Sequence, residues 1–167
     1  KKVTLATLFK KVAEGKPITW LTCYDYPTAY FQDQAGIDMI LVGDSLGMTM
    51  LGYYSTLPVT MDDMMRHTAA VRRGAPTAWV IGDMPYMSYQ PSVETAVRNA
   101  GRFMAETACD AIKLEGGAEF AEVVERIAGR LLTLPLYPGM GEDGVRLVVD
   151  GLAAAVRGAR GGGGGDA

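Results

Sequence analysis

A regular alternation of short apolar segments and longer amphipathic segments constrains the fold of this chain more than any other feature. The apolar segments cover residues 18–22, 39–42, 78–81 and 111–114. Each has the length of a strand, and the stretches between them show helical spacing of apolar residues and glycines that stop a helix. Strands separated by helices pair in parallel, and continuously apolar strands are buried on both faces. The alternation therefore favours an α/β fold, either a β/α barrel or a doubly wound sheet.

The expected helices begin at residues that commonly cap helices. Thr4 can cap a helix that reaches about Val12, and Thr60 can cap the helix that follows it. The segment 43–59 is rich in Gly, Ser and Thr and reads as a long loop. Further helices are expected over residues 26–35, 61–73, 91–107 and 118–127, and a weaker pattern predicts a strand over 131–136 and a helix over 144–156.

The chain is shorter than a complete barrel. It has 167 residues, whereas an eight-fold β/α barrel typically needs ~250. We expect residues 1–128 to form the N-terminal part of a β/α barrel domain, with about four to five βα units. Residues 129–160 are expected to form a divergent segment, and the Gly-rich residues 161–167 a disordered tail.

The composition after Gly151 is unusual. Ala, Arg and Gly dominate this region, which suggests translation of GC-rich DNA in a shifted reading frame. Resequencing the gene across the codons for residues 122–136 tests this hypothesis, which a continuous frame would exclude. The run of glycines near the end is not followed by Lys-Ser or Lys-Thr, so it is not a phosphate-binding loop.

Charge and composition exclude several classes of partner. The net charge of -3 provides no basic field for nucleic acid or an anionic membrane, and no apolar stretch reaches the ~18 residues of a membrane span. Cys23 and Cys109 belong to no metal-binding or redox motif, so we expect free, buried or half-buried thiols. We therefore expect a cytoplasmic protein with no nucleic-acid or membrane partner.

Acidic residues follow three of the predicted strands at nearly the same point. Asp44 and Asp83 each come directly after a glycine that ends an apolar strand, and Glu115 ends the next strand in a similar way. The carboxyl ends of parallel strands meet at one edge of the sheet, where sites are built. Partly desolvated carboxylates repel one another, a cation compensates them, and hard oxygen ligands favour magnesium. The spacing predicts a magnesium site; the alternative is a set of helix caps and surface acids.

Other polar residues accompany these acids. Lys113 lies two residues before Glu115 and therefore leaves the same face of the strand, where it can hold a substrate carboxylate. Ser45 offers a hydroxyl and a backbone amide either to an anionic ligand or to a turn. His67 is the only histidine, and inside a predicted helix we expect a packed or surface imidazole. It has no Ser or Cys partner in a motif context, so no nucleophilic triad is visible.

The chain resembles ketopantoate hydroxymethyltransferase in a series of motifs that keep their order and spacing. The motifs are Asp25-Tyr26-Pro27-Thr28-Ala29, Leu41-Val42-Gly43-Asp44-Ser45-Leu46-Gly47-Met48, Ser55-Thr56-Leu57-Pro58-Val59-Thr60, His67 with Arg72-Arg73-Gly74-Ala75-Pro76, Asp83-Met84-Pro85-Tyr86-Met87-Ser88-Tyr89, and Lys113-Leu114-Glu115-Gly116-Gly117. The resemblance covers about Thr4 to Val124. It implies a (β/α)8 TIM barrel of the phosphoenolpyruvate/pyruvate-binding type, here incomplete, and a homo-oligomer.

The same resemblance implies a reaction and its residues. Magnesium ligands would be Asp44, Asp83 and Glu115, and keto-acid contacts would come from Asp44, Ser45, Asp83 and Lys113. The family transfers a hydroxymethyl group from 5,10-methylenetetrahydrofolate to 3-methyl-2-oxobutanoate, giving 2-dehydropantoate in pantothenate biosynthesis. Magnesium would act as a Lewis acid that stabilises the enolate of the keto acid.

The chain departs from the family beyond its first half. The family carries a Gly-His-(Ile or Leu)-Gly-Leu-Thr-Pro segment after the fifth strand and, further on, a glutamate that serves as general base. Neither is found here, so no residue is assigned as the base. Two alternatives stay open: an inactive fragment that binds magnesium and keto acid and needs a partner chain to complete the barrel, and a lyase or mutase of the wider superfamily.

Overall fold

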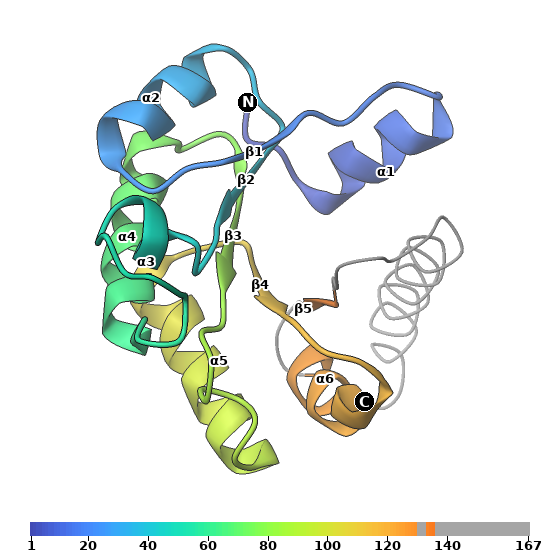
Figure 1. Ribbon diagram of the computed structural model, residues 1–167. Coiled ribbons are helices and arrows are strands. Elements are labelled where there is room, and N and C mark those ends of the chain that lie inside the picture. The colour runs from blue at the N-terminus through green and yellow to red at the C-terminus, as the bar shows by residue number, and fades with distance from the viewer. Residues whose placement is uncertain (130–132, 136–167) are drawn as a thin grey trace, which may run out of the picture.

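Parallel strands in sequence order form the centre of the molecule. The computed structural model describes residues 1–129 and 133–135 (Figure 1). Its strands form one five-stranded sheet with the order β1-β2-β3-β4-β5, and each neighbouring pair is parallel. The strands are β1 (Trp20–Thr22), β2 (Met39–Val42), β3 (Trp79–Asp83), β4 (Ala111–Leu114) and β5 (Thr133–Pro135). A doubly wound sheet would reverse its strand order at a switch point, so this order confirms a partial barrel.

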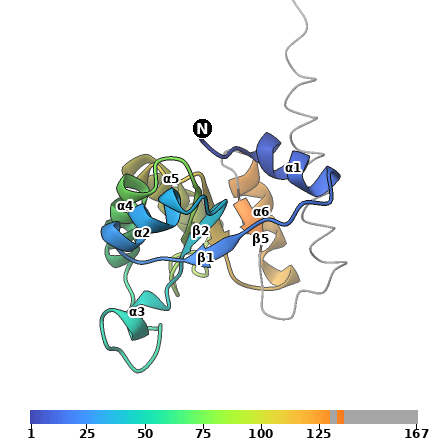
Figure 2. The same cartoon turned by 90° about the horizontal axis from the view of Figure 1, so that it is seen from above.

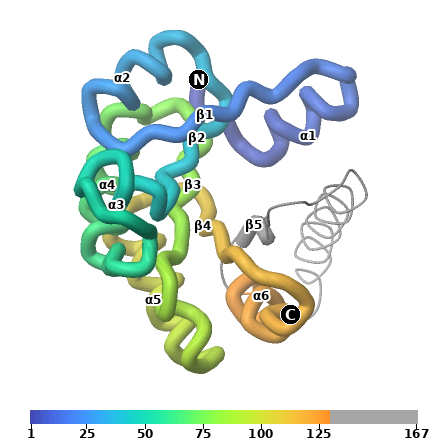
Figure 3. Tube along the Cα trace, viewed as in Figure 1, coloured from blue at the N-terminus to red at the C-terminus, as the bar shows by residue number. Residues whose placement is uncertain are grey.

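Helices surround the strands in chain order. Contacts join α2 to α4, α4 to α5, and α5 to α6, and the Cα trace in Figure 3 follows this succession around the sheet. Viewed from above, α2, α4 and α5 lie together on one side of the strands (Figure 2). The helices are α1 (Leu5–Ala13), α2 (Tyr26–Gln34), α3 (Leu46–Thr49), α4 (Met61–Gly74), α5 (Val93–Thr107), the 3-10 helix η1 (Ala118–Phe120) and α6 (Ala121–Ala128).

The predicted caps are confirmed, and they fix where two helices begin. The Thr4 hydroxyl accepts from the amide of Thr7, and Thr7 returns the contact in a capping box. Thr60 and Asp63 form the same reciprocal arrangement at the start of α4. Each box satisfies amides that have no partner inside the helix.

Several element boundaries differ from the prediction; strand β3, for example, extends past the predicted end at residue 81 to include Asp83. Helix α3 lies inside the segment predicted as a loop, because four residues are too few for a recognisable apolar period. Helix α5 begins at Val93 rather than at residue 91, because Ser92 caps it by accepting from Thr95. Strand β1 is shorter than predicted, and the helix predicted over 118–127 is divided into η1 and α6. The predicted helix over 144–156 and the tail over 161–167 lie outside the described residues, as do most of residues 129–160.

Both faces of the central strands are apolar, as predicted for a sheet covered on both sides. Ile40, Val80 and Ile112 share one face and belong to a core cluster beneath the surrounding helices. Trp79 and Ile81 alternate with them on the other face, in a second cluster that also holds Leu8 of α1 and other strand residues. Side chains alternate along a strand. On each strand, the residue two positions after the last member of this second cluster therefore lies on the same face, at the carboxyl edge of the sheet.

The first strand forms an open edge of the described sheet. Strand β1 pairs only with β2, and its Trp20 and Leu21 are 40% and 46% exposed. A complete barrel would bury both faces of this strand against its neighbours. No helix among the described residues is both long and apolar enough to span a membrane.

Candidate functional site

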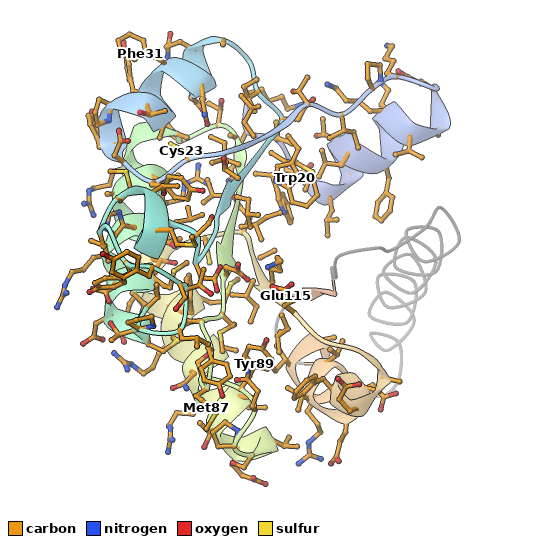
Figure 4. The ribbon with its side chains drawn as sticks, in the orientation of Figure 1. Trp20, Cys23, Phe31, Met87, Tyr89 and Glu115 are labelled. Atoms are coloured by element: carbon orange, nitrogen blue, oxygen red, sulfur yellow. The ribbon has the colours of Figure 1, made fainter. Side chains whose placement is uncertain are left out.

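The carboxyl edge of β2, β3 and β4 carries the acids and the lysine that the sequence singles out. Asp83 is the last residue of β3 and pairs in register with Lys113 of β4. The amide of Asp44, in the turn after β2, donates to Asp83 Oδ2 at 3.3 Å. Glu115 directly follows β4 (Figure 4). The parallel sheet thus brings side chains from three consecutive strands to one edge.

Lys113 and Asp83 form a buried ion pair. The Lys113 Nζ lies 2.8 Å from Oδ1 and from Oδ2 of Asp83, and the two side chains are only 13% and 4% exposed. Burial raises the pKa of the Asp83 carboxyl to about 6, although the ammonium of Lys113 opposes this rise. Burial lowers the pKa of Lys113, but the carboxylates of Asp83, Glu115 and Asp44 outweigh it, and the pKa of the lysine is raised. Lys113 is therefore protonated at neutral pH.

The other two acids lie in wetter surroundings. Asp44 is half-buried, and burial raises its pKa against the lowering effects of Lys113 and of a hydrogen bond from Thr56. The Glu115 side chain is 46% exposed, and its Oε2 lies 3.5 Å from Lys113 Nζ. One lysine thus faces the charge of three carboxylates, which leaves a surplus of negative charge at this edge.

The donor chemistry of this edge suits magnesium, although the side chains are not arranged as a ready metal site. Carboxylate oxygens are the ligands that magnesium prefers, and surplus negative charge in a half-buried place favours a cation. Within residues 1–129 and 133–135, no three His, Cys, Asp or Glu side chains group closely enough to hold a metal ion. Lys113 occupies the position between Asp83 and Glu115. A metal would have to displace the lysine from Asp83, and the assignment of Asp44, Asp83 and Glu115 stays a prediction.

Ser45 reaches the same edge and contacts a residue that sequence reasoning missed. Its Oγ lies 2.7 Å from the phenolic oxygen of Tyr24. His67 Nδ1 lies 2.6 Å from the backbone carbonyl oxygen of Tyr24, and since a carbonyl only accepts, this nitrogen carries the hydrogen. The histidine is thus a packed residue that supports the chain, in line with its expected role. The sequence feature that could have identified Tyr24 is its position just after β1, at the edge where the acids converge.

Tyr89 ends one of the resembling motifs, but the sequence predicts no role for it. Its hydroxyl donates to the carbonyl of Glu115 at 2.5 Å, and its ring stacks edge-on against Phe120 at 5.4 Å. Gly116 follows with a φ of 156°, and a side chain there would collide with the Phe120 ring. These contacts hold the loop after β4, and with it the backbone of Glu115 (Figure 4).

The cysteines take no part in this edge. Cys23 and Cys109 are free and buried, as the sequence predicts. Burial raises the pKa of the Cys109 thiol to about 11, which makes it an inert core residue at neutral pH.

Comparison with known proteins places the sequence in one group. The profile of a family described as ketopantoate hydroxymethyltransferase matches residues 2–135. A 3-methyl-2-oxobutanoate hydroxymethyltransferase from Syntrophus aciditrophicus is 57% identical over 127 residues, which are 76% of this chain and 47% of the relative. One from Alkaliphilus metalliredigens is 54% identical over 145 residues, 87% of this chain and 50% of the relative. The chain thus spans about half the length of these curated relatives.

Solved structures agree on the fold. A phosphonopyruvate hydrolase in complex with oxalate and Mg²⁺ superposes with a TM-score of 0.65 at 13% identity, covering 92% of this chain and 56% of the other. An oxaloacetate acetylhydrolase gives a TM-score of 0.62 at 13% identity, covering 94% and 61%. A 2,3-dimethylmalate lyase, a member of the PEP mutase/isocitrate lyase superfamily, gives 0.56 at 18% identity, covering 96% and 61%. At such low identity these likenesses concern the barrel fold alone.

Proposed function

The chain belongs to the ketopantoate hydroxymethyltransferase family, and we propose that it binds 3-methyl-2-oxobutanoate and activates it for hydroxymethyl transfer. The observation that carries the proposal is the meeting of Asp83, Lys113 and Glu115 at one strand edge, with Asp44 beside them. Such a group offers oxygen ligands for a divalent cation and an ammonium for a carboxylate. A magnesium-chelating α-keto acid needs both.

The ion pair provides a physical reason for joint binding of cation and keto acid. Lys113 and Asp83 neutralise each other when no ligand is bound. A cation that binds the Asp83 carboxylate leaves the lysine without its partner, and the carboxylate of the keto acid can replace it. Ser45 adds a hydroxyl and an amide at the same edge. Binding of each ligand therefore removes the electrostatic cost of binding the other ligand alone.

The remaining steps follow from the chemistry of the substrate. Asp44, Asp83 and Glu115 would hold the magnesium ion, which supplies Lewis-acid stabilisation of an enolate when it is bound. The C3 carbon of the keto acid loses a proton to a base, and its carbanion then attacks the methylene carbon of 5,10-methylenetetrahydrofolate. Water supplies the hydroxyl of the new hydroxymethyl group as the bond from this carbon to nitrogen breaks, and tetrahydrofolate is released. No residue of this chain is assigned as the base. We propose 2-dehydropantoate as the product, on the way to pantothenate, in a cytoplasmic homo-oligomer.

Exchange of the C3 hydrogen tests the proposal. Proton NMR in heavy water would follow this signal of 3-methyl-2-oxobutanoate with the purified chain, in the presence and absence of magnesium. We expect exchange that requires the metal and that Glu115→Gln abolishes. Glu119→Gln is the matched control, because within the described residues this glutamate forms a hydrogen bond only with the nearby amide of Gly117. Absence of exchange from a folded sample would contradict activation and leave at most binding of the keto acid.

A further inference from the structure

We propose that Tyr24 is a positioning residue of the keto-acid site. Its hydroxyl holds the Ser45 hydroxyl so that the serine donates to the carboxylate of the bound keto acid. The inference rests on the proposed function and adds to it a residue that touches no substrate and acts through Ser45.

The Ser45 hydroxyl does not cap the helix at whose start it lies. Ser45 is the N-cap residue of α3, where a serine normally accepts from an amide two or three residues later. Here its side chain makes no capping hydrogen bond. Its Oγ lies 2.7 Å from the phenolic oxygen of Tyr24 instead. The serine is therefore turned away from the helix and held by the tyrosine.

Tyr24 is anchored on both sides of its own backbone. The amide of the preceding Cys23 donates to the carbonyl of Leu41 in β2 at 3.0 Å. The carbonyl of Tyr24 itself accepts from His67 of α4 at 2.6 Å. The side chain of Asp25 then caps α2 by accepting from the amide of Thr28 at 2.8 Å. With its ring packed against the core cluster, the phenol has little freedom to drift away from Ser45.

Chemistry fixes the direction of the hydrogen bonds once the keto acid is bound. A carboxylate only accepts hydrogen bonds, so Ser45 must donate its single hydroxyl hydrogen to the ligand. The tyrosine hydroxyl must then donate to Ser45 Oγ, and this bond polarises the serine hydroxyl towards the anion. The resulting order is Tyr24 to Ser45 to carboxylate.

The space for this arrangement is kept open by a glycine. A Cβ on Gly43 would lie 3.1 Å from Ser45 Oγ and 3.9 Å from Asp83 Oδ2. Any side chain at residue 43 would therefore crowd the serine on the side that faces the aspartate. Residue 43 thus lies between Ser45 and the aspartate proposed to bind magnesium.

A double-mutant cycle tests the inference. The full chain with magnesium would be titrated with 3-methyl-2-oxobutanoate by calorimetry, in the wild type, Tyr24→Phe, Ser45→Ala and the double variant. We expect Tyr24→Phe to raise the Kd about fivefold, the effect of losing one neutral hydrogen bond. The double variant should bind no more weakly than Ser45→Ala, because the tyrosine acts only through the serine. Tyr26→Phe, at an exposed tyrosine two residues away, should leave the Kd unchanged.

The outcomes separate the inference from the function on which it rests. If the folded wild type binds no keto acid, the proposed function fails and the inference fails with it. If the wild type binds and Tyr24→Phe binds equally well, only the inference is overturned. Additive losses in the double variant would also overturn it, because they would show that Tyr24 acts independently of Ser45. Circular dichroism of each variant shows that the comparison is made between folded proteins.

Discussion

The ammonium of Lys113 lies 2.8 Å from each carboxylate oxygen of Asp83, and both side chains are nearly inaccessible to solvent. The two residues are register partners at the carboxyl ends of β3 and β4. Breaking such a pair leaves an uncompensated charge in a dry place, which is far more costly than breaking a pair on the surface. The site is therefore also a determinant of stability.

Lys113→Met is expected to destabilise the chain by about 3 kcal/mol at pH 8, because Asp83 stays buried without its partner. Urea unfolding followed by circular dichroism measures this loss. Lys10→Met should change stability by less than about 0.5 kcal/mol, because Lys10 is an exposed lysine of α1.

The double variant Lys113→Met with Asp83→Asn supplies the control for the charge itself. It should recover part of the stability, because no buried charge is left uncompensated. A double variant less stable than Lys113→Met would contradict this reason, because it would show that the Asp83 carboxylate stabilises this edge even without the lysine, for example by accepting from the amide of Asp44.

Gly82→Ala is expected to destabilise the chain by about 1 to 3 kcal/mol. A Cβ at residue 82 would collide with the ring of Phe103, a fully buried residue of α5. The matched control is Gly101→Ala within α5, where a Cβ meets nothing within 4 Å. That substitution should stabilise the helix by about 0.5 to 1 kcal/mol. Thermal unfolding of both variants tests the close packing of α5 on β3, and equal midpoints would contradict it.

The Asp38 carboxyl makes the stability of the folded chain depend on pH. Its carboxylate accepts from Lys11 Nζ at 2.6 Å and from the amide of Thr19 at 2.9 Å, and so ties α1 to the start of β1. Burial raises the pKa of Asp38, but these hydrogen bonds outweigh it, and the pKa is lowered. The unfolded chain therefore binds this proton at a higher pH than the folded chain does. The contribution of Asp38 to stability is fully present above the ordinary aspartate pKa of about 3.9. It is lost as the pH falls through the lowered pKa that this carboxyl has in the folded chain.

Asp38→Asn should accordingly be less stable than the wild type at neutral pH, and the gap should close in acid. Urea unfolding of both proteins at pH 7 and at about pH 3 measures the gap. A difference that is equally large at the two pH values would mean that packing around residue 38, rather than its charge, holds α1 in place.

The strands that short apolar runs define could be predicted from the sequence. Contacts between polar groups far apart in the chain could not. Strands β2 and β4 have the predicted bounds, because each is a compact run flanked by turn residues. The hydrogen bond between Tyr24 and Ser45 joins residues 21 positions apart, and no periodicity encodes it. Lys113 was expected to face the site and does so, but the pattern could not show that Asp83 would be its partner.

The most direct test of this account is whether keto-acid binding requires magnesium. Calorimetry would titrate 3-methyl-2-oxobutanoate into the folded chain with and without magnesium, and into Asp44→Asn with the metal. Asp62→Asn, at an exposed aspartate of α4, serves as the control. We predict binding that depends on the metal, is lost in Asp44→Asn and is kept in Asp62→Asn. Binding that is equally tight without magnesium, or no binding by the folded wild type, would contradict the assignment of this strand edge as a magnesium and keto-acid site.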